Sequence, residues 1–208
     1  MVTPPANPSS TQKPFTIAIA GGGIGLTFAI GLLRQNVPFH LYEAAPAFAE
    51  VGAGVSFGLN SLHAMSLIDS AITKGYNERA TSNAWDEKKT TWFDFRLGQD
   101  VKGVGKAGEQ IVEIKVGEVG QSSIHRAVFL NELVALVPKE RVSFGKRVVG
   151  VEELRDEWGV NLRFTDGGEA EASAIVGCDG VKRNLRRILL KITTPLTRAL
   201  QASMPTEA

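Results

Sequence analysis

The stretch IAIAGGGIGLTFA, residues 17–29, decides the fold of this 208-residue chain. The residues from Phe15 to Ala20 are apolar without alternation, which is typical of a parallel strand covered on both faces. After the glycines, apolar side chains recur at helical spacing at Leu26, Ala29, Ile30 and Leu33. A second apolar run, VPFHLYEAAP at 37–46, predicts another strand. The sequence therefore predicts an α/β fold that begins with a Rossmann-like β-α-β unit.

A strand, a glycine loop and a helix in this order can hold the diphosphate of a dinucleotide. Backbone N–H groups at the start of a helix are unpaired and carry a partial positive charge. Glu43 ends the second strand 22 residues after Gly21, where an acidic side chain accepts hydrogen bonds from ribose hydroxyls. We expect a cofactor loop formed by Gly21, Gly22, Gly23 and Gly25. A glycine turn that serves packing alone is the alternative.

The glycine spacing departs from the usual G-x-G-x-x-G pattern, because the third position falls on Leu26. In one interpretation, the leucine side chain wedges the helix away from the strand. In the other, the loop slips by one residue, so that Ala20, Gly22 and Gly25 form A-x-G-x-x-G. We favour the slip, because the strand is apolar on both faces and tolerates the shift.

Composition narrows the class of protein. Apolar residues make up 43% and charged residues 22% of the chain, as in ordinary globular proteins. A net charge of +1 gives no electrostatic argument for nucleic acid as a partner. No apolar run approaches the roughly 20 residues needed to span a bilayer, so we predict no membrane partner. One cysteine, Cys178, fits a reducing compartment, and we expect a cytoplasmic location and no metal site.

The remaining sequence predicts further elements. We expect a glycine-rich loop at 51–60 and one amphipathic helix marked by Leu62, Met65, Ile68 and Ala71. Strands are expected within 90–98 and 109–120, and a helix marked by Leu130, Leu133, Val134 and Val137. Two alternating strands at 146–154 and 159–168 predict a β-meander. A short buried strand within 172–180 and a helix over 185–192 complete the prediction.

Four motifs occur in a fixed order: GGGIG…YEAAP, EVGAGVSFGLNSL, SIHRAVFLNEL and DGGEAEASAIVGCDGVKRNLRRILL. Together they resemble the class A FAD-dependent aromatic monooxygenases of the p-hydroxybenzoate hydroxylase type, and most closely the salicylate hydroxylase-like branch. The resemblance covers residues 15–191. The chain departs from the family pattern at Leu59, where proline is typical, at His63, where arginine is usual, and at Arg183, where serine is usual.

The resemblance implies FAD as the cofactor and assigns roles to individual residues. Glu43 would bind the adenosine ribose, and Gly52, Ala53 and Gly54 would lie against the cofactor. Arg126 matches the family arginine that contacts FAD at the start of its helix. Asp179 and Gly180 match the Asp-Gly motif associated with FAD and the nicotinamide cofactor. Arg126 as a solvated cation and Asp179 as a helix N-cap are the alternatives.

The resemblance also implies domain organisation. Residues 15–80 and 126–192 would form a discontinuous FAD-binding domain, and 81–125 part of an antiparallel substrate-domain sheet. We expect a disordered tail at 1–14 and a tail at 193–208. The family extends for roughly as long again and carries there a Gly-Asp motif that binds the flavin. No such motif follows residue 180, so we expect a C-terminal truncation relative to the family.

The implied activity is hydroxylation of a small, salicylate-like aromatic substrate with NADH or NADPH and O₂. No catalytic residue can be assigned, and the oligomeric state stays open. The alternative is a non-catalytic, truncated nucleotide-binding fragment. An NAD-dependent reductase is disfavoured, because the GAG, HR and GCDG stretches would have no role in it.

Overall fold

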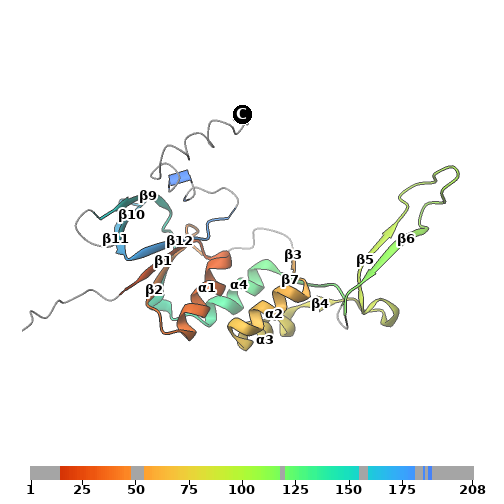
Figure 1. Ribbon diagram of the computed structural model, residues 1–208, viewed down its shortest axis with the longest axis horizontal. Helices are drawn as coiled ribbons and strands as arrows, with labels where there is room; N and C mark the ends of the chain where they lie inside the picture. The colour runs from red at the N-terminus through yellow and green to blue at the C-terminus, as the bar shows by residue number, and fades with distance from the viewer. Residues whose placement is uncertain are drawn as a thin grey trace, which may run out of the picture.

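The computed structural model describes residues 15–47, 54–117, 120–154 and 159–180, together with Leu185, Arg187 and Ile188. Figure 1 shows the arrangement of the elements. In chain order they are β1 (Ile17–Ala20), α1 (Gly23–Arg34), β2 (Phe39–Tyr42), β3 (Gly54–Ser56), α2 (Leu59–Ile68), α3 (Ser70–Arg79), β4 (Thr81–Ser82), η1 (Asp86–Lys88), β5 (Thr91–Arg96), β6 (Gln110–Lys115), β7 (Ser122–His125), α4 (Arg126–Ala135), η2 (Lys139–Arg141), β8 (Val142–Ser143), β9 (Val148–Glu153), β10 (Val160–Phe164), β11 (Glu169–Ala172) and β12 (Ala174–Gly177).

A parallel sheet organises the molecule, with strand order β12-β1-β2-β8. Ile17 of β1 pairs with Phe39 of β2 on one side and with Ala174 of β12 on the other. The predicted β-α-β unit is therefore confirmed, and the short strand predicted before Asp179 is β12. Because β1 is central, its carboxyl end is flanked by the ends of two neighbouring strands.

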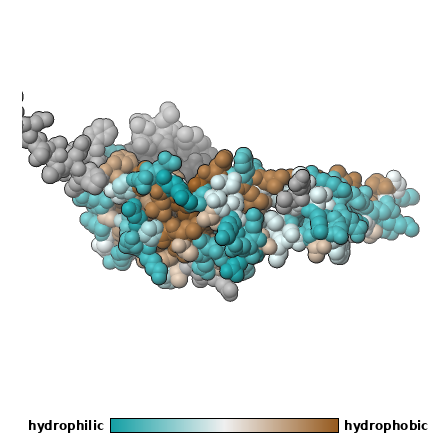
Figure 2. Space-filling view, turned by 90° about the horizontal axis from the view of Figure 1, so that it is seen from below, coloured by the Kyte–Doolittle hydropathy of each residue, from teal (hydrophilic) through white to brown (hydrophobic). Residues whose placement is uncertain are grey.

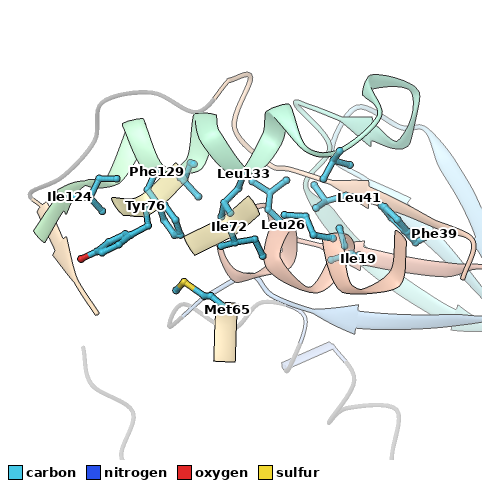
Figure 3. Close-up of a cluster of buried hydrophobic side chains, with 14 residues drawn as sticks. Ile19, Leu26, Phe39, Leu41, Met65, Ile72, Tyr76, Ile124, Phe129 and Leu133 are labelled. Carbon is cyan, nitrogen blue, oxygen red and sulfur yellow. The ribbon is translucent and has the colours of Figure 1, made fainter. Parts of the chain in front are cut away.

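The two faces of β1 contribute to two separate cores. Ile19 packs with Leu26 and Leu41 in a cluster that α1, α2, α3 and α4 cover (Figure 3). Ala18 and Ala20 point to the other face, where they join Leu162 and the neighbouring meander. This division explains why β1 is apolar without alternation, as expected of a strand buried on both sides.

The helix predicted over Leu62–Ala71 is two helices, α2 and α3, so this prediction is wrong. The chain turns at Asp69, whose backbone is extended (φ −161°, ψ 123°) and whose carboxylate accepts a hydrogen bond from the N–H of Ala71. Asp69 is thus an N-cap for α3, a role that favours aspartate. The apolar spacing continues across the break, which is why periodicity alone did not reveal it.

The predicted β-meander is an antiparallel sheet of order β11-β10-β9. Leu162 of β10 pairs with Val151 of β9 and with Ala170 of β11. Its buried side chains, including Phe164, pack against the face of the parallel sheet that the helices leave open.

The loop predicted at 51–60 also contains more structure than expected, because β3 and the start of α2 lie within it.

Strands β5 and β6 form the expected hairpin, which projects away from the helices and the parallel sheet (Figure 1). One face of the hairpin is apolar and exposed: Phe93, Phe95, Val112 and Ile114 are 45%, 47%, 47% and 41% exposed. In Figure 2, brown hydrophobic surface gathers in the middle of the body and extends toward the thin end, where the hairpin lies. An isolated two-stranded hairpin has little stability of its own in water.

None of the helices in the described ranges has the length and apolar content needed to cross a membrane. The helix predicted at 185–192 falls largely outside the described residues; Leu185 and Ile188 are helical, and Leu185 is buried in the second core.

Candidate functional site

A pocket of about 710 Å³ opens at the carboxyl ends of β1, β2 and β12. Its wall includes the glycine loop, Glu43, Arg126, Asp179 and Gly180, which were predicted as site residues from distant parts of the sequence. Ligands of open α/β sheets bind at this edge, in the crevice outside the strand ends. The fold therefore brings most of the predicted residues together at one place.

Gly21 makes the tight turn that leaves β1. Its φ is +105°, and a Cβ atom added there would lie 2.4 Å from the carbonyl oxygen of Cys178. No other residue type fits this position without moving the backbone of the neighbouring strand end. Ala20, by contrast, is still in β1 and pairs with Tyr42. The slipped interpretation, which placed Ala20 at the turn, is wrong on this point.

A loop of this kind has two further requirements besides the tight turn: backbone open to close approach by a ligand, and close packing of helix and strand. Gly23 and Gly25 meet them. A Cβ on Gly23 would meet only the Arg126 side chain, 3.9 Å away, so the backbone there is open to a ligand. A Cβ on Gly25 would lie 3.0 Å from Cγ2 of Ile19, so Gly25 permits close contact between α1 and β1. Leu26 is fully buried in the first core. The three tasks thus fall on Gly21, Gly23 and Gly25.

The amino end of α1 faces the pocket without a side-chain cap. Its N-cap residue is Gly22, and its first turn contains no acidic residue. The unpaired N–H groups of the first turn and the partial positive charge of the helix end are therefore available to an anion. Gly22, Gly23 and Ile24 line the pocket at this point.

Glu43 lies at the amino end of α1, as predicted. One carboxylate oxygen, Oε2, accepts a hydrogen bond from the N–H of Gly22 at 2.5 Å, and the other, Oε1, from the N–H of Ala45 at 2.8 Å. A carboxylate has about four acceptor positions, so two remain for hydroxyl donors. Backbone hydrogen bonds to Ser143 and Lys146, both 2.8 Å, fix the main chain of Glu43.

Arg126 is the first residue of α4 and follows β7 directly. Its guanidinium lies next to Gly23, since Nη2 is the atom nearest to the Cβ position of that glycine. Arg126 is exposed, and in the described part of the chain it forms no ion pair with a carboxylate. A free cation and the open helix end therefore face the same part of the pocket.

Asp179 and Gly180 follow β12, and the backbone N of Asp179 lies close to the turn at Gly21. The Oδ2 atom of Asp179 accepts a hydrogen bond from the N–H of Leu185 at 2.8 Å, six residues further along the chain. An N-cap side chain bonds the second or third residue of its helix, so the N-cap role of Asp179 stays a prediction. Both residues also line the pocket, and Gly180 has a φ of +74°. Burial raises the pKa of the neighbouring Cys178 thiol, which therefore stays protonated near neutral pH.

The second predicted glycine motif is only partly described. Gly52 and Ala53 lie outside the described residues. Gly54 is in β3, where it pairs with His125, and does not line the pocket. Its neighbour Val55 does, together with Phe57.

One wall of the pocket, beyond Glu43, contains none of the site residues predicted from the sequence. Lys146, Arg147 and Val148 line it from the segment between β8 and β9. They lie there because β8 pairs in parallel with β2, so that Tyr42 is opposite Ser143. Residues 146–148 were predicted to begin a strand, but the pairing of β8 with β2 has no signal in the local sequence.

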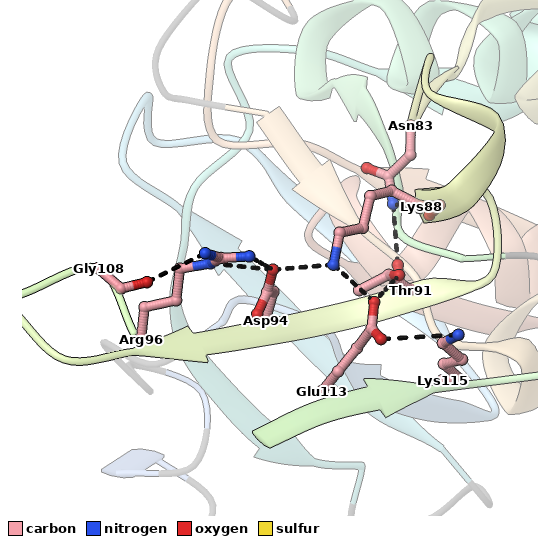
Figure 4. Close-up of polar contacts among 8 residues, drawn as sticks. All are labelled: Asn83, Lys88, Thr91, Asp94, Arg96, Gly108, Glu113 and Lys115. Atoms are coloured by element: carbon pink, nitrogen blue, oxygen red, sulfur yellow. Dashed lines mark hydrogen bonds and ion pairs between the residues drawn. The ribbon is translucent and has the colours of Figure 1, made fainter. Parts of the chain in front are cut away.

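A second polar cluster lies at the base of the hairpin, away from the pocket (Figure 4). The Lys88 ammonium donates to Asp94 Oδ2 at 2.9 Å and to Glu113 Oε1 at 2.8 Å. These contacts, led by the bond from Lys88, lower the pKa of both carboxyls. Within the described residues, no group of three or more metal-binding side chains occurs.

The arrangement at the strand ends can hold a nucleotide diphosphate. Backbone N–H groups and a guanidinium converge on one part of the pocket, and a carboxylate fixed at the edge of that part can accept ribose hydroxyls. The open backbone at Gly23 leaves room for close approach of a phosphate. The residues present therefore fit the adenosine diphosphate portion of FAD.

Comparison with known proteins agrees with this geometry. The chain matches no protein-family model. It is 41% identical over 184 residues to 6-methylsalicylate 1-monooxygenase of Aspergillus terreus, covering 86% of this chain and 40% of that protein. It is 41% identical over 179 residues to a salicylate hydroxylase of Pseudomonas putida, covering 84% of this chain and 38% of that protein.

Among solved structures, a salicylate hydroxylase in complex with its substrate superimposes with a TM-score of 0.69 and 32% identity, over 88% of this chain and 40% of that one. The chain thus spans about 40% of the length of the curated relatives it matches. Over that length, its homologues are salicylate hydroxylase-like FAD-dependent monooxygenases.

Proposed function

We propose that the pocket binds FAD through the adenosine diphosphate portion of the cofactor. The observation that carries this proposal is the position of Glu43, whose carboxylate bonds the backbone of the glycine loop at the amino end of α1. In a protein that binds FAD there, the acid holds the adenosine ribose with its two remaining acceptor positions, and the helix end faces the diphosphate.

The other residues at the strand ends have distinct tasks in this proposal. The Arg126 guanidinium neutralises diphosphate charge beside Gly23, where a compact backbone allows close approach. Asp179 fixes the chain after β12 through its bond to Leu185, and so holds Gly180 at the pocket wall. In this proposal Gly52 and Ala53 contact the cofactor, whereas Gly54 does not line the pocket.

We further propose that the protein acts as a monooxygenase that hydroxylates a small, salicylate-like aromatic compound with NADH or NADPH and O₂. Bound FAD would supply the redox and oxygen chemistry. The residues of this chain bind and orient the cofactor, and the apolar pocket wall formed by Val55, Phe57 and Met65 excludes water beside it. The single cysteine supports a reducing compartment such as the cytoplasm.

A second candidate function is FAD binding without turnover by this chain alone. Two observations favour it. The chain spans about 40% of its relatives, and the apolar face of β5 and β6 is exposed. Within the described part of residues 81–125, which we assign to a substrate domain, the elements are this hairpin, the short helix η1 and the short strands β4 and β7.

One experiment tests both candidates. The purified chain is incubated with FAD and desalted, its visible flavin spectrum is recorded, and NADH and NADPH oxidation are followed with and without salicylate. Bound flavin with salicylate-stimulated oxidation supports the monooxygenase. Bound flavin without oxidation supports the second candidate. A folded protein that retains no flavin contradicts both, and Glu43→Ala is the control that should abolish retention.

A further inference from the structure

The proposed contacts give the nucleotide a direction in the pocket. Arg126 and Gly23 mark the diphosphate end, and Glu43 marks the ribose. In a nucleotide, the base is attached to the ribose on the side away from the phosphates. The base therefore belongs at the wall beyond Glu43, which is formed by Tyr42, Ala44 and residues 146–148.

The main chain of this wall is fixed in place. The N–H of Lys146 donates to the carbonyl oxygen of Glu43 at 2.8 Å, and the N–H of Thr165 donates to the carbonyl oxygen of Arg147 at 3.0 Å. Val148 begins β9 and is only 8% exposed. The side chain of Arg147 thus starts from a rigid position one residue away from a direct contact with Glu43.

The two cations of this wall, Lys146 and Arg147, differ in their contacts with other side chains. The Lys146 ammonium is 2.5 Å from Oδ2 of Asp166 and 5.3 Å from the centre of the Phe164 ring. Arg147 is exposed at the pocket wall, and across the described residues its guanidinium has no ion pair, side-chain hydrogen bond or ring contact. Arg147 is therefore the cation available to a ligand at this end.

A guanidinium suits a flat base better than an ammonium does. It is planar and weakly hydrated, and it stacks on aromatic faces. A phosphate is a poorer candidate for this wall, because the contacts of Arg126 and Glu43 already place the diphosphate beside Gly23 and leave the wall beyond Glu43 for the base.

We propose that Arg147 stacks on the adenine ring and makes this pocket selective for purine over pyrimidine nucleotides. The inference rests on the proposed function. It adds a specificity-determining residue at the wall beyond Glu43.

The test compares ADP with UDP, which share ribose and diphosphate but differ in the size of the base. Affinities for ADP, UDP and FAD are measured by isothermal titration calorimetry for the unaltered chain, Arg147→Ala and Arg147→Lys. A stacking contact at an exposed site predicts a loss of about three- to fivefold for ADP and FAD in both variants. UDP should lose less, so that the ratio of ADP to UDP affinity falls.

Arg163→Ala is the matched control, because Arg163 is an exposed arginine of β10 that pairs with Glu152 and does not line the pocket. It should leave all affinities unchanged. Equal losses for ADP and UDP in Arg147→Ala, or full affinity in Arg147→Lys, would show simple attraction of charge and overturn the inference, as would no loss at all. If the unaltered chain binds neither ADP nor FAD, the proposed function fails and the inference fails with it.

Discussion

The carboxylate of Glu43 and the N–H of Gly22 are joined by a 2.5 Å hydrogen bond. The bond links the end of β2 to the N-cap of α1, two points that are 21 residues apart in the sequence. It holds the acid at the open helix end, so the proposed ribose site is preorganised.

Replacing Glu43 should weaken nucleotide binding strongly. A hydrogen bond to a charged group contributes about 1.5–3 kcal/mol, so Glu43→Ala should lower FAD affinity by at least tenfold. The measurement is a fluorescence titration of FAD with each variant. Glu140→Ala, at an exposed acid outside the pocket, is the control. Equal affinities of Glu43→Ala and the unaltered chain would contradict the assignment of the ribose site.

Gly21 and Gly23 should respond differently to the same substitution. Gly21→Ala places a Cβ against the Cys178 carbonyl at a φ of +105°, which should destabilise the fold by about 2 kcal/mol or more. Gly23→Ala adds its Cβ in open space within α1, where alanine favours the helix. We expect Gly23→Ala to keep or raise the melting temperature and still weaken FAD binding, because the methyl group occupies the place of a phosphate.

Thermal unfolding and FAD titration of both variants distinguish these effects. A Gly23→Ala protein with unchanged FAD affinity would show that the loop serves packing alone, which was the alternative considered from the sequence.

The part of the site formed by residues 17–43 could be predicted from local sequence, whereas the positions of Arg126 and Asp179 could not. The strand, glycine loop and helix, and the distance to Glu43, are encoded within 27 residues, from Ile17 to Glu43. Arg126 and Asp179 reach the pocket only because β7 precedes α4 and β12 pairs with β1. Periodicity and spacing carry no information on such pairings, so both residues came from the family resemblance.

Two errors have local physical causes. The favoured slip of the glycine loop placed Gly25 correctly against β1, but it put Ala20 at the turn, which Gly21 makes with a φ of +105°. The break between α2 and α3 depends on the cap at Asp69, without the glycine or proline that usually marks a helix end. Arg147 was missed because its place beside Glu43 follows from the pairing of β8 with β2.

Asp69 should contribute to stability both as a cap and as an ion-pair partner. Its side chain is 8% exposed, accepts a bond from Ala71 and pairs with Arg34 of α1 at 2.6 Å. Asp69→Ala should lower the free energy of unfolding by about 2 kcal/mol, whereas Asp69→Asn keeps the cap and should cost less. Asp86→Ala, at an 89% exposed acid, should have little effect. Urea unfolding measures the free energy of unfolding of the three variants and of the unaltered chain.

The same aspartate predicts a pH dependence. The hydrogen bond from Arg34, followed by the bond from Ala71, lowers the pKa of Asp69 below its ordinary value of 3.8. A carboxyl whose pKa is lowered by folding stabilises the fold above its unfolded pKa, and this contribution disappears as the pH falls through the folded pKa. The difference in stability between the unaltered chain and Asp69→Asn should therefore shrink below about pH 4.

Lys88 should stabilise the hairpin, because its ammonium group compensates the negative charges of two neighbouring carboxylates. Asp94 of β5 lies directly opposite Glu113 of β6, and like charges in such a pair destabilise a sheet. The Lys88 ammonium bonds both carboxylates and lowers the pKa of each, so acid should weaken the hairpin of the unaltered chain. In Lys88→Met the two carboxylates repel each other without compensation, so their protonation at low pH should relieve this repulsion and weaken the hairpin less.

We expect Lys88→Met to lose hydrogen-exchange protection in β5 and β6 at neutral pH, and to lose less on acidification than the unaltered chain. Lys115→Met removes a more exposed cation, 3.6 Å from Glu113, and should change little. The hairpin projects away from the parallel sheet (Figure 1) and contributes no residue to the pocket lining, so FAD affinity should be equal in all three proteins. Unchanged protection in Lys88→Met would mean that Arg96 and Lys115 alone compensate the two acids, and that the lysine has no structural role there.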